Sequence, residues 1–235
     1  MNLDELSARL TASATEWLAA AVVDIKRSPQ SITHHFPAAS RQCGRTSWNS
    51  DDPQGVTDGC LDDLAREAML AALPTRGVDL VAVATDLYRH GDAHEKRGVL
   101  RGAHRLDPAA VGTSLLPLVD DALRSNDPRL IASATQQYGA EHLSADAFRQ
   151  AVVKCVFVGV PLAAVVGLRA RRDAELARML VDLAHERVAA GRPIPPDIPP
   201  LVAAFPASLD RPDLPAAFIE RLTAQLPVIS STIQE

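Results

Sequence analysis

Apolar residues recur every three or four positions through most of the chain, which is the spacing of one face of an α-helix. Leu61, Leu64, Ala65 and Ala68 show the pattern clearly. Strict alternation, which would indicate strands, is not the dominant pattern. The spacing predicts nine or ten helices, at 2–25, 60–73, 78–90, 92–104, 107–123, 127–138, 144–160, 161–168, 173–191 and 215–226.

Several of these segments begin with a residue that caps helices well. The oxygen of an Asp or Ser side chain can accept a hydrogen bond from the free amides of the first turn. Proline fits the first helical position, because its missing N–H would be unpaired there anyway. The sequence therefore predicts helix starts at Asp92, Asp107, Asp127, Ser144 and Asp173.

The segment 144–160 is the most apolar in the chain, and its apolar residues extend nearly all round a helix. We therefore expect a buried central helix. Lys154 lies inside it. Burying an unpaired ammonium group costs several kcal/mol, so Lys154 must reach solvent, pair with an acid or contact an anionic ligand. A desolvated lysine can also act as a base or form a Schiff base, and these alternatives stay open here.

Two regions lack the helical pattern. Residues 28–59 form the longer one, and we expect an irregular loop there with at most a short helical turn near 37–42. Eight of the 17 prolines lie between Pro193 and Pro215, which indicates an extended arm. The sequence thus predicts an all-α fold of antiparallel hairpins in a HEAT-like array, or α-solenoid, over 1–192. We expect the arm and a last helix, 193–235, to pack on or beside it.

Composition narrows the function. Aromatic residues make up only 4% of the chain, so the core must be aliphatic. The net charge of −5 argues against a dedicated nucleic-acid binder, including the helical-repeat DNA glycosylases. Three widely spaced cysteines favour a reducing cytoplasm over a disulfide framework. The longest uncharged central run is too short to span a membrane, so we expect no direct membrane insertion.

The sequence contains few residues in the pattern of a known metal-binding or catalytic motif. The seven histidines form no H-E-x-x-H, and the cysteines form no C-x-x-C, so we expect no metal site and no cofactor. Cys43 would be a nucleophile only if a histidine such as His35 approached it, and a small residue in an ordered loop is the simpler interpretation. Phosphate-binding loops and serine-nucleophile motifs in a suitable context are also missing.

Basic residues offer the clearest candidate for a site. Arg41 and Arg45 flank Cys43, and Lys96, Arg97 and Arg101 follow on a short predicted helix. Together these groups could bind a phosphate or carboxylate. The alternative is that the run Glu95 to Arg97 is simply a solvated helix face, which is the more common fate of such a run.

Five segments resemble the EboA family, small helical proteins encoded in ebo-type gene clusters. The resemblance covers most of the chain and rests on the order and spacing of these segments more than on any one of them. They are F-P-A-A-S-R-Q-C-G-R (36–45), H-E-K-R-G-V-L-R (94–101), D-A-L-R-S-N-D-P-R (121–129), V-V-K-C-V-F (152–157) and A-H-E-R-V-A-A-G-R (184–192).

The resemblance implies a bacterial, cytoplasmic protein in the traffic or biosynthesis of secondary metabolites. Implied partners are a small metabolite and proteins of the same pathway, among them a membrane-embedded prenyltransferase-like protein. The family supplies no established catalytic residues. Motif positions are carried over only as a candidate ligand surface, formed by Arg41, Arg45, Arg101, Asn126, Lys154 and Arg187.

Two hypotheses follow from these observations. The first is a non-enzymatic helical scaffold that binds a metabolite or a partner, and the lack of a catalytic motif supports it. The second is an enzyme that acts on a phosphorylated or anionic small molecule, with Arg41, Arg45 and Lys154 as an anion clamp.

Overall fold

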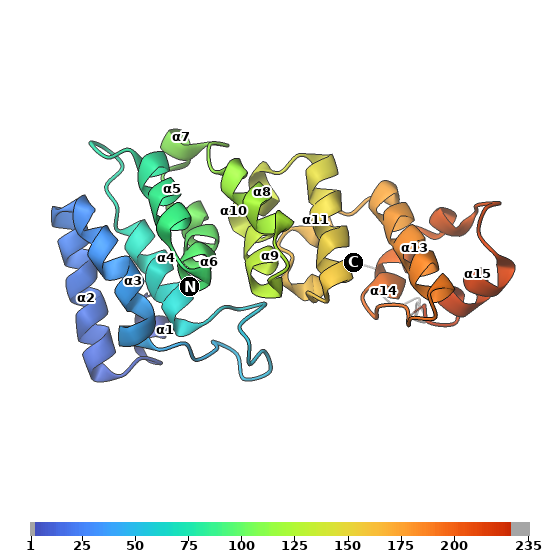
Figure 1. The fold of residues 1–235 in the computed structure, drawn as a ribbon, viewed down its shortest axis with the longest axis horizontal. Helices are drawn as coiled ribbons and strands as arrows, with labels where there is room; N and C mark the ends of the chain where they lie inside the picture. Colours follow the sequence, from blue (N-terminus) through green and yellow to red (C-terminus); the bar gives the residue numbers. More distant parts are fainter. Residues whose placement is uncertain (1–2, 227–235) are drawn as a thin grey trace, which may run out of the picture.

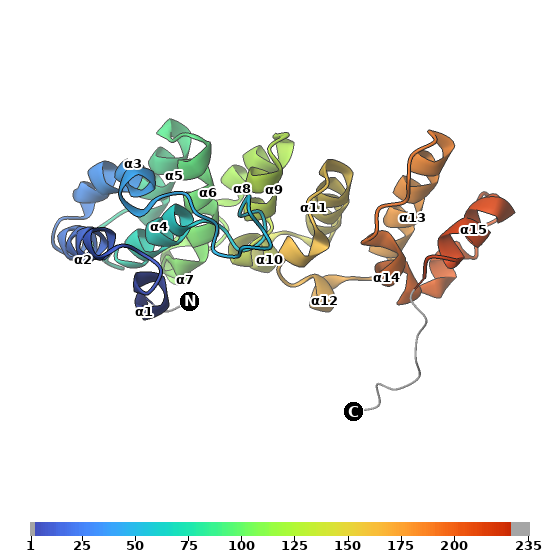
Figure 2. The same ribbon diagram turned by 90° about the horizontal axis from the view of Figure 1, so that it is seen from below.

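The computed structural model describes residues 3–226, and this part of the chain is all-helical, as predicted. The helices follow one another along the long axis of an elongated molecule, from α2 and α3 at one end to α15 at the other (Figures 1 and 2). The α-helices are α1 (Leu3–Ser7), α2 (Ala12–Arg27), α3 (Ile32–Cys43), α4 (Leu61–Ala71), α5 (Leu80–His90), α6 (Ala93–Gly102), α7 (Pro108–Val111), α8 (Leu116–Arg124), α9 (Pro128–Ala134), α10 (Gln137–His142), α11 (Ala145–Val158), α12 (Leu168–Arg171), α13 (Ala174–Ala189), α14 (Ile198–Ala203) and α15 (Ala216–Thr223).

Four short 3₁₀ helices connect some of these elements in the described part of the chain, and Ser47 and Cys60 form an isolated antiparallel bridge. The 3₁₀ helices are η1 (Pro29–Ser31), η2 (Ala103–Arg105), η3 (Leu162–Ala164) and η4 (Pro206–Leu209). The linear succession of helices is established for the described residues, whereas a regular HEAT-like repeat stays a prediction.

The predicted number of helices, nine or ten, is wrong, because several predicted helices are divided. Thr11 caps α2 and so separates it from α1. Gly112, at φ 47°, ends α7. The hydroxyl of Tyr138 then holds the turn before α8, since it accepts from the amide of Leu115 at 3.0 Å and donates to the carbonyl of Gly112 at 2.8 Å. A side chain remote in sequence thus fixes this break.

The expected irregular loop at 28–59 is also too long. Its first half contains α3, with Pro37 inside the helix. Proline disfavours a helix interior, but the apolar face of α3 is buried against neighbouring helices, and this burial outweighs the lost hydrogen bond. Within this region, the segment from Gly44 to Gly59 lacks helix, and we call it the 44–59 loop.

The five predicted helix starts that have a capping Asp or Ser are confirmed, whereas the helix predicted at 161–168 is wrong, because η3 and the start of α12 lie there. In α6, α7, α9, α11 and α13 the residue before the helix accepts a hydrogen bond from an amide of the first turn. These residues are Asp92, Asp107, Asp127, Ser144 and Asp173. Capping depends on residues next to one another in the chain, which is why the sequence alone was sufficient.

Helix α11 is not the fully buried central helix that its composition predicted. It packs against α9 and α13, and its remaining face is open, so that Phe157 is 60% exposed. Lys154 lies one turn from Phe157 and is half-buried. Its ammonium group can therefore stay hydrated without a buried partner.

The C-terminal arm packs on α13 through α14 and η4. Arg211 of the arm forms an ion pair with Asp182 of α13 at 2.5 Å, and Arg178 pairs with the same carboxylate at 2.8 Å. The division of the chain at residue 192 stays a prediction, and residues 227–235 of the arm lie outside the described residues. Among residues 3–226, no helix is both long enough and apolar enough to cross a membrane.

Candidate functional site

Helices α4 and α6 pack closely near the middle of the N-terminal half, and two glycines on α6 allow it. Gly98 and Gly102 are four residues apart and so lie on one face. A Cβ atom at Gly98 would lie 2.4 Å from Cδ of Arg66, and one at Gly102 would lie 2.6 Å from Cδ1 of Leu70. Any larger residue at Gly98 would collide with the side chain of Arg66.

Within this interface Asp62 and Arg66 form a buried ion pair on α4. Arg66 donates from Nη1 to Asp62 at 2.8 Å, from Nη2 to the hydroxyl of Ser40 at 2.9 Å and from Nε to the carbonyl of Phe36 at 3.1 Å. The hydroxyl of Ser40 in turn donates to Asp62 at 2.7 Å. The pair therefore fastens α3 to α4.

A second buried pair joins α4 to α6. Arg97 donates to the carboxylate of Asp63 at 2.5 Å and to the carbonyl of Gly55 at 3.2 Å. The same carboxylate accepts from the amide of Cys60 at 2.9 Å. Arg101 donates to the carbonyl of Thr57 at 2.9 Å. These two arginines hold the 44–59 loop against α6.

We call Asp62, Asp63, Arg66, Arg97 and Arg101 the buried charged cluster. Three guanidinium groups and two carboxylates give it a net charge of +1. Burial shifts the pKa of two members: it raises the pKa of Asp63, although Arg97 opposes the shift, and it lowers the pKa of Arg101. Removing charges from water costs several kcal/mol each, so their mutual pairing is needed to keep them buried.

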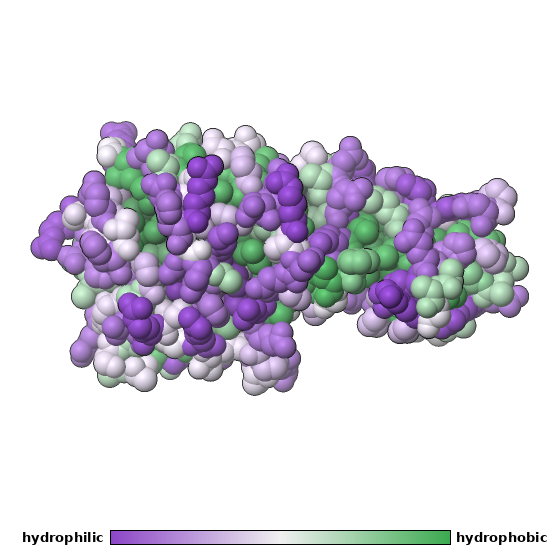
Figure 3. Space-filling model, in the orientation of Figure 1, coloured by the Kyte–Doolittle hydropathy of each residue, from purple (hydrophilic) through white to green (hydrophobic). Residues whose placement is uncertain are grey.

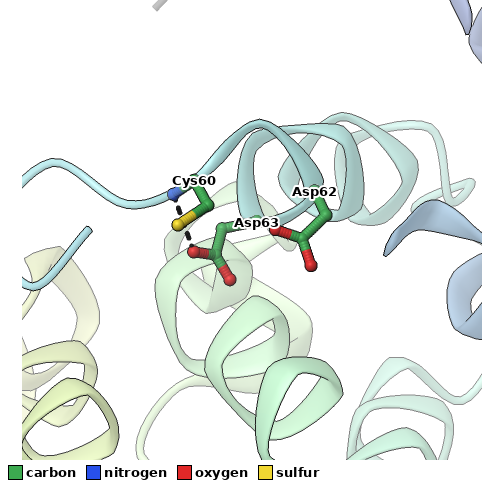
Figure 4. A group of neighbouring side chains, drawn as sticks. All are labelled: Cys60, Asp62 and Asp63. Atoms are coloured by element: carbon green, nitrogen blue, oxygen red, sulfur yellow. Dashed lines mark hydrogen bonds between the residues drawn. The ribbon is translucent and has the colours of Figure 1, made fainter. Parts of the chain in front are cut away.

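Figure 4 shows three side chains of this region that lie close enough together to be considered as metal ligands. One ligand atom from each of Cys60, Asp62 and Asp63 lies within 4.8 Å of the others. However, Arg97 already bonds Asp63 and lies 3.9 Å from Sγ of Cys60, and burial raises the pKa of that thiol. Guanidinium groups thus supply the positive charge that a metal ion would supply, and the donor set fits a metal ion poorly.

Some polar atoms of this region are buried and have no hydrogen-bond partner among the described residues. They are Asp62 Oδ1, Asp63 Oδ1, His94 Nδ1, Arg97 Nε, Arg97 Nη1 and Arg101 Nη1. The side chains of Asp63 and Arg97 are at most 1% exposed, so the cluster is closed to a metabolite. We therefore interpret the cluster as a structural core, and a ligand site requires an open pocket.

The pocket between α3 and α5 meets that requirement. It has a volume of about 510 Å³, within the range of about 300–1,000 Å³ that is usual for small-molecule sites. Figure 3 shows apolar surface between these two helices. The apolar part of its lining consists of Pro29, Ile32, Pro37, Val78, Val83 and Leu87.

The polar part of the lining comes from η1, the start of α3, α5 and α6. It consists of Gln30, Thr33, Asp86, His90 and Glu95, together with the backbone of Gly91. Glu95 is fixed, because it accepts a hydrogen bond from the amide of Asp92 at 3.0 Å in the capping box of α6. Helix α6 thus contributes to both regions, with arginines in the buried charged cluster and Glu95 in the pocket.

A second pocket, of about 570 Å³, lies beside α12 and α14. Arg169, Arg172 and Asp197 line it together with apolar residues. The carboxylate of Asp197 accepts from the amide of Leu162 at 3.1 Å. This pocket is therefore basic, whereas the pocket between α3 and α5 is acidic.

The residues predicted to form a ligand surface are spread over several helices. Arg41 and Arg45 are exposed at the end of α3 and just after it, and Asn126 is exposed before α9. Lys154 lies on α11. Arg187, on α13, donates to the carbonyl of Pro193 at 3.1 Å. In both ribbon views α3 and α11 lie in different parts of the molecule (Figures 1 and 2). The single anion clamp stays a prediction.

Arg101 is the member of that set that the structure places in the interior. Arg97 and Arg101 donate to groups of the chain itself, Asp63 and the carbonyls of Gly55 and Thr57, and their part in a site for phosphate or carboxylate stays a prediction. Lys96 instead lies over the ring of Tyr88, with Nζ 4.9 Å from the centroid. The interpretation of this run as a solvated face is wrong for Arg97, which is 1% exposed.

Cys43 is the last residue of α3 and is buried, not part of a loop. Burial, with a smaller contribution from nearby Asp62, raises the pKa of its thiol to about 11. His35, the proposed activating histidine, contacts Asp24 and Trp17 instead. Cys43 is therefore unsuited to act as a nucleophile.

Sequence reasoning missed Asp62, Asp63 and Arg66 and the apolar pocket. A local signal for the first pair was present, since Asp62 and Arg66 have the spacing of a helical ion pair. The spacing of Gly98 and Gly102 was a signal for close helix packing. The pocket had no such signal, because residues from three separate segments line it.

A family model described as "Metabolite traffic protein EboA" matches residues 3–203 of the 235 residues. No curated protein and no solved structure matches the chain significantly.

Proposed function

The chain belongs to the EboA family of metabolite traffic proteins, and from this premise we propose that it is a non-enzymatic helical scaffold that binds a metabolite in the pocket between α3 and α5. The family name supports a role in metabolite traffic. The binding site and the absence of catalysis are our inference.

One observation carries the proposal: the pocket is open, mainly apolar and of ligand size, with a few polar groups at its edge. Such pockets are the usual sites of small-molecule binding. The buried charged cluster offers stronger polar groups but is closed, and it is best explained by its hydrogen bonds to α3 and the 44–59 loop. It supports the pocket by fixing α3 and α6, two of the three helices that line it.

We further propose that the row of helices, arranged as a HEAT-like array, presents the bound metabolite to other proteins of its pathway. The membrane-embedded prenyltransferase-like protein implied by the family resemblance is the first candidate. The apolar surface between α11 and α13 in Figure 3 is separate from the pocket and so leaves room for such a contact.

Mass spectrometry of metabolites that co-purify with the protein tests the proposal. Val83→Trp places a large side chain in the pocket, and Ala163→Trp makes the matched change in the second pocket. Both positions are incompletely buried, so both variants are expected to fold, as thermal unfolding would verify. We expect the wild type and Ala163→Trp to carry the same apolar metabolite and Val83→Trp to lose it.

Retention of that metabolite by a folded Val83→Trp protein would overturn the proposal. Lys154→Ala, measured in the same experiment, addresses the enzyme hypothesis with the anion clamp. A loss of ligand in Lys154→Ala but not in Val83→Trp would favour the clamp over the pocket.

A further inference from the structure

We propose that the ligand of the pocket between α3 and α5 has an apolar body and a cationic end such as a protonated amine, and not an acidic end. This inference rests on the proposed function and specifies the chemical class of the ligand. It follows from the charges that line the pocket.

The pocket lining contains two carboxylic acids, and His90 is its remaining titratable side chain. Asp86 is exposed on α5, and Glu95 is half-buried at the start of α6. Among the described residues, no lysine or arginine lines the pocket. The orientation of Glu95 is set, because one of its oxygens accepts from the amide of Asp92. The two carboxylates therefore give the lining a negative charge, and like charges repel an anionic ligand.

The backbone of α3 adds a further acceptor. Pro37 lies inside α3 and has no N–H, so the carbonyl of Thr33 lacks the donor that it would normally have four residues on. Thr33 and Pro37 both line the pocket. An ammonium or hydroxyl group could donate a hydrogen bond to this carbonyl, whereas an ionised carboxylate could not.

The second pocket shows that the sign of the charge is a property of the site and not of the whole protein. Its volume is similar, about 570 Å³, but Arg169 and Arg172 line it. An anionic ligand would therefore be drawn to the second pocket, and the two pockets serve as controls for each other.

Displacement of a neutral fluorophore, N-phenyl-1-naphthylamine, by decylammonium, decanol and decanoate below their micelle concentrations tests the inference. The three share one chain and differ in the charge of the end group. We expect decylammonium to bind the wild type about five- to tenfold more tightly than decanoate, with decanol between them, because partly exposed charges contribute about 1 kcal/mol.

Two double variants test which residues cause the preference for decylammonium over decanoate. Asp86→Asn with Glu95→Gln removes both negative charges, and the glutamine side chain that replaces Glu95 can still complete the capping box of α6. We expect this variant to lose the preference for decylammonium and to bind decanol unchanged. Arg169→Gln with Arg172→Gln is expected to keep the preference.

The outcomes separate the inference from the function on which it rests. If decanoate displaces the fluorophore as well as decylammonium does, or if the acidic variant keeps the preference, the cationic ligand class is wrong and the pocket stands. If the fluorophore binds Val83→Trp as tightly as the wild type, the pocket itself is not the site.

Discussion

The exposure of a charged residue on α6 and of one on α11 is the opposite of what the polarity of the surrounding sequence alone would suggest. Helix α6 carries the run Glu95 to Arg97 in a polar segment, yet Arg97 is 1% exposed. Helix α11 carries Lys154 in the most apolar segment of the chain, yet Lys154 is only half-buried. The polarity of the surrounding sequence therefore does not indicate how exposed either side chain is.

The physical reason lies in what packs against each helix. Gly98 and Gly102 let α4 approach α6 closely, and α4 brings the carboxylates of Asp62 and Asp63 into the interface. Within the described part of the chain, helix α11 packs mainly against α9 and α13 and leaves a face open. A charge is buried where a partner of opposite charge is supplied, and it stays near water where none is supplied.

The largest change in the free energy of unfolding is expected when Asp63, the partner of Arg97, is removed. Asp63→Ala leaves the guanidinium of Arg97 buried without its counter-charge, and breaking such a pair typically costs about 3–5 kcal/mol. Lys154→Ala, the matched change on α11, is expected to alter the free energy of unfolding by no more than about 0.5 kcal/mol. Urea denaturation of both variants measures the difference.

The double variant Asp63→Leu with Arg97→Met is the control. Because it removes both charges together, we expect it to recover most of the stability that Asp63→Ala loses. A double variant as unstable as Asp63→Ala would mean that lost packing, not an unpaired charge, explains the effect.

A smaller effect on stability is expected from a substitution that disturbs the close approach of α4 and α6. The methyl group of Gly98→Ala would meet Arg66, which is held by hydrogen bonds to Asp62, Ser40 and Phe36 and cannot move aside freely. Overpacking of this kind costs about 1–3 kcal/mol. Alanine also favours helix over glycine by about 1 kcal/mol, which opposes the loss.

We therefore expect a lower midpoint of thermal unfolding for Gly98→Ala, and a smaller decrease for Gly102→Ala, where the closest atom is the flexible end of Leu70. An increase in the midpoint for Gly98→Ala would show that the glycine is not required for packing.

The smallest expected effect is on the pH dependence of stability. Burial lowers the pKa of His94 below its usual value of 6.5, although Asp62 opposes the shift and Arg45 and Arg97 reinforce it. Below pH 6.5 the unfolded chain then binds a proton at His94 more readily than the folded chain does. Stability from this residue is therefore lost as the pH falls through this region.

Measurement of the free energy of unfolding at about pH 7 and about pH 5, on either side of the usual histidine pKa, tests this sign. We expect the wild type to lose more stability than His94→Gln between the two values. An equal loss in both proteins would show that His94 is not linked to folding, since the other titrating groups are common to both.

Much of the local structure was predictable from the sequence. The helix starts at Asp92, Asp107, Asp127, Ser144 and Asp173 depend on a side chain and an amide two or three residues apart, so no long-range information was needed. The all-helical class followed from the spacing of apolar residues. The family was recognisable from the order and spacing of short segments along one chain, and the family model agrees.

Tertiary structure decided the rest. It formed α3 in spite of Pro37, because burial of an apolar face outweighs one lost hydrogen bond. It divided the helix predicted at 107–123 through Tyr138, buried Arg97 and Arg101 beside acids and loop carbonyls, and left Lys154 half-buried. Tertiary structure also formed the pocket between α3 and α5, because residues from separate segments line it. The sequence determines where helices begin, but the environment of a charge depends on which helix packs against it.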